Sequence, residues 1–197
     1  MNFDILLREK PCECGKVHKC DIKHILIEKG AIQKINNLLG AYHRVLIVAD
    51  TNTYSICGEA VKAQIGDKLE SVLIFQRDGL LVPNEDAINE MNAYITNDTD
   101  LVVAIGSGVI QDLCKCVSFQ HALPYYIVAT APSMDGYASV GAAMIIDNMK
   151  VTYNAHVPEA IIGDVDVLKN APMDMIKSGY GDILGKYSCL NDWKLSH

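Results

Sequence analysis

Three small residues, Gly106, Ser107 and Gly108, follow the apolar run 101–105 and precede a stretch with helical spacing. Glycines at such a turn let the backbone approach a phosphate closely, and the following helix offers free N–H groups and the positive end of its dipole. The dinucleotide-binding fingerprint G-x-G-x-x-G would place a third glycine where this chain has Gln111. The turn is therefore a partial match, and a tight strand–helix turn without a ligand is the competing interpretation.

Two aspartates near this turn are candidates for the same ligand. Asp50 ends the run Val-Leu-Ile-Val-Ala-Asp, and a carboxylate at the carboxyl end of a parallel strand can accept hydrogen bonds from a ribose. In the usual dinucleotide fold the acid follows the glycine turn, whereas Asp50 precedes it, so a helix N-cap is an equal alternative. Asp112 and Lys115 lie on the helix after the turn, where a solvated face is the competing interpretation.

A long irregular segment follows the apolar run 125–129. It carries Thr130, Ser133, Asp135 and Ser139, and side chains of this kind suit a nicotinamide amide, a ribose or a polyol. Ligands of open α/β sheets bind at the carboxyl ends of the strands, which is where this segment starts. A loop that satisfies its own polar groups is the alternative, although such a loop rarely needs this length.

Asp182 and Lys186 are four residues apart in a helical pattern and therefore share a face. A surface ion pair is the ordinary interpretation, and a metal ligand is the sharper one. None of the six histidines shows a His-x-x-x-His or Glu-x-x-His spacing.

The amino-terminal segment Pro-Cys-Glu-Cys-Gly-Lys-Val-His-Lys-Cys contains Cys12, Cys14, His18 and Cys20. Three thiols and an imidazole could form a tetrahedral zinc site. The single residue between the first two cysteines is a shorter gap than zinc sites usually have. We therefore expect free thiols rather than bound zinc.

Apolar runs alternate with segments of helical periodicity, which predicts an open parallel sheet with helices on both faces. The predicted strands are uniformly apolar, as expected for a sheet buried on both sides. The spacing predicts strands at 24–30, 44–50, 71–76, 100–108 and 125–130, and helices at 31–40, 53–69, 85–96 and 109–122. It also predicts two strands within 140–156 joined by a turn at Asn148-Met149, a short strand within 160–168, and a helical region 171–197 interrupted at Gly179 and Gly181.

Composition excludes several classes of protein. The 197 residues are 50% hydrophobic and carry a net charge of −7, with no cluster of Lys and Arg, which argues against nucleic-acid binding. The first residues carry charges within a short apolar run, unlike a signal peptide, and no run approaches the roughly 20 apolar residues of a membrane span. Seven cysteines without a secretory signal predict reduced thiols and a cytoplasmic location.

Three motifs together, GSGVIQDLCK, TAPSMDGYAS and GYGDILGK, resemble the sn-glycerol-1-phosphate dehydrogenase family, within the superfamily of iron-containing alcohol dehydrogenases and dehydroquinate synthases. The resemblance implies an amino-terminal NAD(P)-binding α/β domain at 1–170 and the start of a helical metal and substrate domain at 171–197. It implies reduction of dihydroxyacetone phosphate to sn-glycerol 1-phosphate by NADH or NADPH with a divalent metal, zinc or nickel.

The resemblance also implies roles for individual residues, when the roles known in the family are transferred to the matching positions of this sequence. Asp135 would meet the substrate, and Asp182 would bind the metal near it. The cofactor would be contacted by Asp50, at the adenosine ribose, and by Gly106, Ser107, Gly108, Asp112, Thr130, Ser133 and Ser139.

The resemblance also implies two histidine metal ligands beyond the end of this sequence, so we expect a truncated chain that is inactive by itself. His197 has no assignable role. A glycerol dehydrogenase-like enzyme acting on a free polyol, and a nucleotide-binding module without catalysis, are the alternatives. An oligomer of identical subunits stays open.

Overall fold

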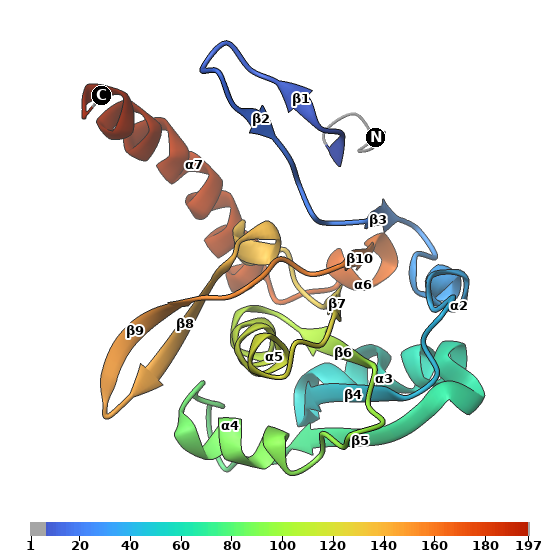
Figure 1. Ribbon diagram of the computed structural model, residues 1–197. Coiled ribbons are helices and arrows are strands. Elements are labelled where there is room, and N and C mark those ends of the chain that lie inside the picture. Colours follow the sequence, from blue (N-terminus) through green and yellow to red (C-terminus); the bar gives the residue numbers. More distant parts are fainter. Residues whose placement is uncertain (1–6, 197) are drawn as a thin grey trace.

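A computed structural model describes residues 7–196, so most of the segment inspected for a signal peptide, and His197, lie outside it. Its centre is a sheet of six strands, all paired in parallel, in the order β3-β10-β7-β6-β4-β5 (Figure 1). This confirms the predicted open parallel sheet. The strands are β3 (His24–Glu28), β4 (Val45–Asp50), β5 (Leu69–Phe75), β6 (Leu101–Gly106), β7 (Tyr125–Ala129) and β10 (Ala160–Asp164).

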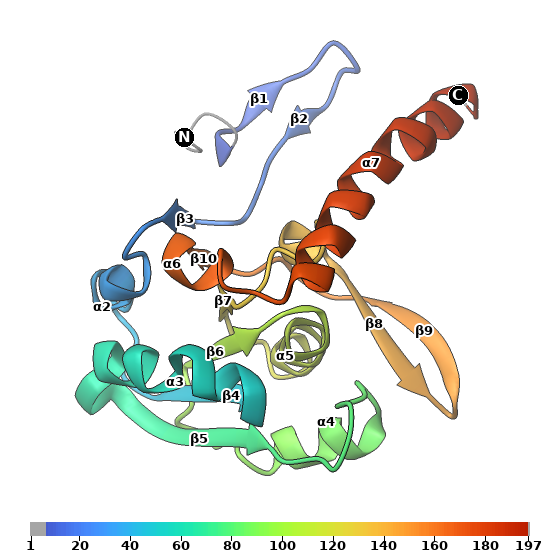
Figure 2. The same ribbon diagram turned by 180° about the vertical axis from the view of Figure 1, so that it is seen from behind.

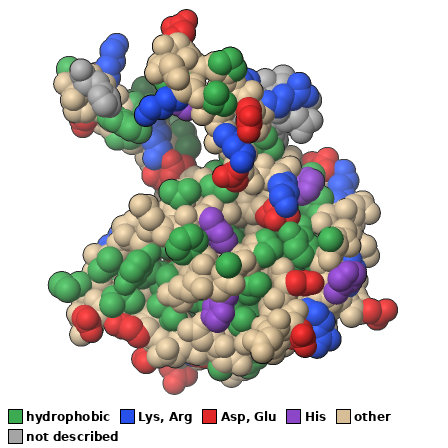
Figure 3. All heavy atoms as spheres, viewed as in Figure 1, with side chains coloured by type: hydrophobic (Ala, Val, Ile, Leu, Met, Phe, Trp, Pro, Cys, Tyr) green, Lys and Arg blue, Asp and Glu red, His purple; other side chains and the backbone are tan. Residues whose placement is uncertain are grey.

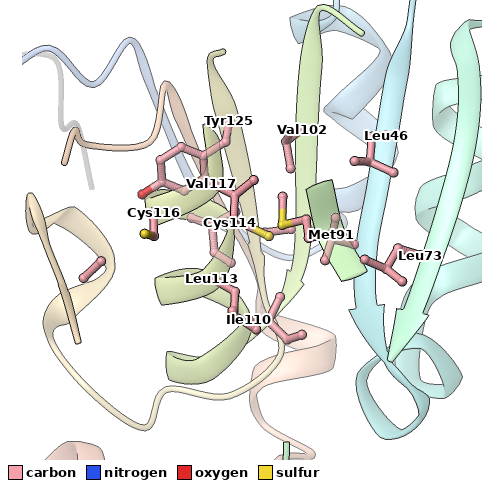
Figure 4. Close-up of a cluster of buried hydrophobic side chains, with 14 of the residues drawn as sticks. Leu46, Leu73, Met91, Val102, Ile110, Leu113, Cys114, Cys116, Val117 and Tyr125 are labelled. Atoms are coloured by element: carbon pink, nitrogen blue, oxygen red, sulfur yellow. The ribbon is translucent and has the colours of Figure 1, made fainter. Parts of the chain in front are cut away.

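Helices cover both faces of this sheet, and neighbouring residues of one strand point to opposite faces. Leu46 of β4 packs with α4 (Glu85–Asn92) and α5 (Gly108–Gln120) on one face, where Figure 4 shows it in one cluster of buried side chains with Met91 and Leu113. Ile47 packs with α3 and the segment around Ile35 on the other face. The helices are α2 (Ile35–Leu38, preceded by the 3₁₀ turn Ile32–Lys34), α3 (Thr51–Ile65, followed by the 3₁₀ turn Gly66–Lys68), α4 (Glu85–Asn92), α5 (Gly108–Gln120) and α6 (Val165–Leu168).

Strand order and register bring three strand ends together. The chain runs outward from β4 to β5 and then crosses back to β6, so β4 and β6 flank the point where the direction of winding reverses. In the register of the sheet, Ala49 lies beside Ile105, and Gly106 lies beside Ala129. The residues that follow β4, β6 and β7 therefore lie next to one another at the carboxyl edge, where open α/β sheets bind ligands.

Two hairpins lie outside the sheet. β8 (Gly141–Ile146) and β9 (Met149–Asn154) pair antiparallel, which confirms the predicted pair of strands. The turn is centred one residue before the predicted position, because Asp147 and Asn148 hold it with φ of 50° and 60°. The second hairpin pairs β1 (Lys10–Pro11) with β2 (Val17–His18).

The last element is α7 (Met173–Leu195), a single helix of 23 residues. The predicted interruption at Gly179 and Gly181 is therefore wrong. A glycine stands at position 179 because the helix packs closely against another segment there. An ideal Cβ at Gly179 would lie 1.9 Å from the carbonyl oxygen of Pro132. Beyond this contact, α7 runs away from the sheet (Figures 1 and 2), and in Figure 3 it stands with the N-terminal hairpin above the body of the molecule.

The predicted domain boundary at 170/171 lies just before Met173, the first residue of α7. That α7 opens a second domain stays a prediction. No helix within residues 7–196 combines the length and the apolar character that a membrane crossing requires.

Candidate functional site

A cleft of about 870 Å³ lies at the carboxyl edge of the sheet, within the size range of small-molecule sites. It is lined by segments that follow β4, β5, β6 and β7 and by the first turn of α7. The lining includes Asp50, Thr51, Phe75, Leu81, Ser107, Gly108, Val109, Thr130, Ser133, Met134 and Met175. Five of the eight residues expected to contact a cofactor are thus neighbours around one cavity.

Asp50 occupies the rim of the cleft and also caps α3. Its Oδ1 accepts a hydrogen bond from the backbone N–H of Thr53 at 2.8 Å, and its own backbone N–H donates to Oγ1 of Thr53 at 3.0 Å. This reciprocal pair is a capping box, which satisfies two backbone donors at the helix start. The N-cap interpretation is therefore confirmed, and the same residue lines the cleft.

The Gly106–Gly108 turn carries two glycines with different constraints. A Cβ at Gly106 would lie 2.6 Å from Cβ of Ile110, so Gly106 allows α5 to start close to β6. A Cβ at Gly108 would meet only Sδ of Met134 at 3.5 Å, an ordinary contact. Gly106 thus serves helix packing, and Gly108 keeps the mouth of the cleft free at the N-terminus of α5.

The loop after β7 is fastened to this turn by polar contacts. The hydroxyls of Ser107 and Ser133 are 2.7 Å apart. The backbone N–H of Thr130 donates to the carbonyl oxygen of Gly106 at 3.0 Å. Because Thr130 is buried and Ser133 half-buried, the two segments form one wall of the cleft.

Gln111, which departs from the glycine fingerprint, proves to be a structural anchor for the loop. Its side chain is fully buried, and Nε2 donates to the carbonyl oxygens of Gly136 at 3.2 Å and Tyr137 at 2.8 Å. Sequence reasoning missed this role. The signal was a long amide side chain where the fingerprint has glycine, within the first turn of the helix.

Asp112 and Ser139 are not among the residues that line the cleft. Instead they surround Lys115, whose ammonium donates to Oγ of Ser139 at 3.0 Å and to the carbonyl oxygen of Gly141 at 2.8 Å and lies 3.8 Å from Asp112. The interpretation of Lys115 as part of a solvated face is wrong, because its side chain is 1% exposed. Burial lowers the pKa of Lys115 and raises that of Asp112.

Asp135 and Asp182 are brought together where α7 meets the loop. The backbone N–H of Asp135 donates to Oδ2 of Asp182 at 2.8 Å, and the Asp135 carboxylate forms an ion pair with Lys186. Lys186 also lies 3.9 Å from Oδ1 of Asp182. The bond from Lys186 holds the pKa of Asp135 below its usual value.

These residues do not form a metal site among residues 7–196. A catalytic ion usually has about three protein ligands and one open position. Within the described chain, Asp182 belongs to no group of three His, Cys, Asp or Glu donors. The donors present therefore do not fit the zinc or nickel ion that the resemblance implies. Among the residues that the structure describes, one such group is present, and it consists of Cys12, Cys14 and His18 in the N-terminal hairpin.

A second cleft, of about 860 Å³, opens at the opposite edge of the sheet. Its lining includes Leu123, Pro124, Val157 and Glu159, which immediately precede strands β7 and β10. It therefore lies at the amino ends of the strands, away from the Gly106–Gly108 turn, although Ala138 and Val140 of the loop after β7 also line it.

The fold and sequence both have relatives. Residues 26–172 match the family model described as iron-containing alcohol dehydrogenase. The chain is 34% identical over 194 residues to a glycerol-1-phosphate dehydrogenase [NAD(P)+] of Halalkalibacterium halodurans, covering 94% of this chain and 48% of that protein. It is 35% identical over 156 residues to the protein of the same name from Bacillus subtilis, covering 77% and 40%. The chain spans about half the length of the curated relatives it matches.

Solved structures with low identity share the fold. Glycerol dehydrogenase from Schizosaccharomyces pombe superposes with a TM-score of 0.74 at 20% identity, over 85% of this chain and 43% of that one. Sulfoacetaldehyde reductase from Bifidobacterium kashiwanohense, solved in complex with NAD+, gives 0.74 at 17% identity, over 86% and 51%. The family model covers most of the chain and includes every strand end around the carboxyl-edge cleft. The chain therefore belongs to the iron-containing alcohol dehydrogenase family.

Proposed function

We propose that this chain binds NAD(P)(H) in the carboxyl-edge cleft and supplies the cofactor-binding half of an enzyme that reduces dihydroxyacetone phosphate to sn-glycerol 1-phosphate. The observation that carries the proposal is the meeting of Asp50, the Ser107–Gly108 turn and Thr130 around one cleft at the reversal point of the sheet. Relatives named glycerol-1-phosphate dehydrogenase [NAD(P)+] support the choice of reaction.

Each part of the cleft suits one part of a dinucleotide. The pyrophosphate would lie at the N-terminus of α5, where Gly108 leaves room. The N–H of Gly108 donates to Oγ of Ser107, and the next N–H groups have no partner within the helix. Asp50 would accept hydrogen bonds from the adenosine ribose. Thr130 and Ser133 would position the nicotinamide end, and Gly106, Asp112 and Ser139 would act by shaping the turn and the loop.

The reaction adds a hydride from NAD(P)H and a proton to the carbonyl group, which gives an alcohol and NAD(P)+. The role of this chain is to hold the nicotinamide ring against the carbonyl carbon and to exclude water from that contact. Asp135 would face the substrate from the junction between the loop and α7. Asp182, which is hydrogen-bonded to Asp135, would lie at the same junction. None of these roles depends on a metal ion, since the described donors near Asp182 do not fit one.

The test separates the two roles of Asp50. Asparagine is as good an N-cap as aspartate, so Asp50→Asn keeps the bond to Thr53 and removes the negative charge. A hydrogen bond to a charged group contributes roughly 1.5–3 kcal/mol, so NADH titrated by fluorescence should bind about 10- to 150-fold more weakly. The melting temperature should not change. Unchanged NADH affinity would show that Asp50 is only a cap, and absence of NADH binding by the wild-type chain would overturn the proposal.

The substrate class is tested by comparing dihydroxyacetone phosphate with dihydroxyacetone as oxidant of NADH. The comparison is made with zinc or nickel present, in this chain and in any longer form of the protein that supplies further metal donors. Preference for the phosphorylated ketone supports the proposed reaction. Preference for dihydroxyacetone, the free ketone, would mean a glycerol dehydrogenase-like enzyme, and NADH binding without turnover in every form would mean a binding module.

A further inference from the structure

The N-terminal hairpin has no hydrophobic core of its own. Its strands β1 and β2 have two residues each, and every residue from 8 to 19 is exposed, including Val17 at 63%. Figures 1 and 2 show the hairpin clear of the central sheet. An isolated two-stranded hairpin is marginally stable in water, and small segments without a core usually depend on a disulfide or a metal ion.

The hairpin instead gathers three donors suited to a metal. Sγ of Cys14 lies 3.3 Å from Nε2 of His18, and the donor atoms of Cys12, Cys14 and His18 all lie within 4.8 Å of one another. Tetrahedral zinc with Zn–S of about 2.3 Å and Zn–N of about 2.05 Å places a sulfur and a nitrogen ligand about 3.6 Å apart and two sulfurs about 3.8 Å apart. The three atoms are thus already near the separations that one ion requires.

A tight turn explains how the thiols of two cysteines separated by one residue can lie around a single metal position. The backbone N–H of Gly15 donates to the carbonyl oxygen of Cys12, and the N–H of Cys12 donates to that of Lys16, both at 2.9 Å. Gly15 has φ of +80°, a left-handed conformation that glycine adopts without steric cost. The chain therefore folds back within a few residues, and His18 on β2 lies across from the thiols.

We propose that Cys12, Cys14 and His18 bind one divalent ion of the zinc class, which pins the hairpin closed. Two thiols and one imidazole favour such an ion over magnesium or calcium, which prefer oxygen ligands. The site is separate from Asp182, and it replaces the expectation of free thiols that the spacing alone suggested. Cys20 lines the amino-edge cleft and is not part of the group, so the fourth position is open to water or an added ligand.

The test uses the untagged 197-residue chain with cobalt(II) as a spectroscopic probe, under a phosphine reductant that keeps the thiols reduced. We expect one cobalt per chain with a thiolate-to-cobalt charge-transfer band, which zinc displaces. Loss of an outer-shell partner alone costs 10–100-fold in affinity, so Cys14→Ser and His18→Ala should each weaken binding by more than about 100-fold. Cys189→Ser, which removes an exposed thiol on α7, is the matched control and should bind as the wild type does.

A second readout reports on the hairpin itself. Trypsin cleavage after Lys16, in the exposed turn, should be slowed by one equivalent of zinc in the wild type and in Cys189→Ser, and should be unaffected in Cys14→Ser. A cobalt complex without thiolate absorption, a band that survives Cys14→Ser, or cleavage that zinc does not slow would each overturn the proposal.

Discussion

Gly179 is the point at which α7 presses against the loop that forms one wall of the cleft. An ideal Cβ at this position would lie 1.9 Å from the carbonyl oxygen of Pro132 and 3.3 Å from the carbonyl carbon of Ser133. Ordinary contacts start at 3.4 Å, so Gly179→Ala requires the helix and the loop to separate by roughly 1.5 Å (3.4 − 1.9). The obstructing atoms belong to backbone, which cannot turn aside as a flexible side chain would.

Two effects of opposite sign decide how much Gly179→Ala changes the free energy of unfolding. Replacing glycine by alanine inside a helix gains up to about 1 kcal/mol of helix propensity. Overpacking typically costs 1–3 kcal/mol, and a clash with backbone belongs at the upper end. We therefore expect net destabilisation of about 1–2 kcal/mol, or a melting temperature lower by about 2–8 °C at this chain length.

The same displacement should reach the cofactor site. Moving the loop separates Ser133 from Ser107, now 2.7 Å apart, and Asp135 from Asp182. Loss of one such polar contact is worth about 1 kcal/mol, so we expect NADH affinity to fall about 5- to 10-fold.

Thermal denaturation and NADH titration of Gly179→Ala should be run beside Gly181→Ala and Gly185→Ala. These two glycines lie in the same helix, and a Cβ at either would have no neighbour within 4 Å. Both controls should be as stable as the wild type or more stable, with unchanged NADH affinity. A Gly179→Ala variant that behaves like Gly181→Ala in both measurements would refute the packing argument.

Three further predictions follow from single contacts. Gly108→Val should weaken NADH binding by at least about tenfold while the melting temperature stays within about 2 °C, because its Cβ meets only Met134 in the protein yet occupies the mouth of the cleft; unchanged affinity would make the turn purely structural. Lys115→Met should lower the free energy of unfolding by about 1–3 kcal/mol in urea denaturation, because the carbonyl oxygen of Gly141 loses the closer of its two side-chain donors and Ser139 loses its bond to the ammonium; an unchanged value would contradict the bonding described. The side chains of Tyr187 and Trp193 on α7 are 82% and 65% exposed, so the chain should self-associate in sedimentation velocity runs and a double Lys substitution should reduce this; identical profiles would show that α7 does not mediate association.

Several features of the fold follow from local sequence alone. Strand periodicity and helix periodicity are set by neighbouring residues, so the alternation of apolar runs with helical segments was sufficient to predict the parallel sheet and its two covered faces. The rule that parallel strands end at one edge then placed Asp50, the Gly106–Gly108 turn and Thr130 together. Cofactor and metal roles for these residues stay predictions.

Other features depend on contacts between segments distant in the sequence. Gln111 and Lys115 look like ordinary polar positions of a helix, and only the arrival of the loop and of β8 makes them buried anchors. Cys12 and Cys14 seemed too close for a metal site until the turn at Gly15 brought His18 across from them.

Gly179 shows the distinction most directly. The sequence determined that this region is helical and contains glycine, and helix propensity by itself suggested a break. Only the tertiary structure decided that the helix continues and that the missing Cβ makes room for the Pro132 carbonyl group, because that carbonyl belongs to a loop 47 residues earlier in the chain. Local preferences are additive along the sequence, whereas steric exclusion between two segments exists only once the fold has placed them in contact.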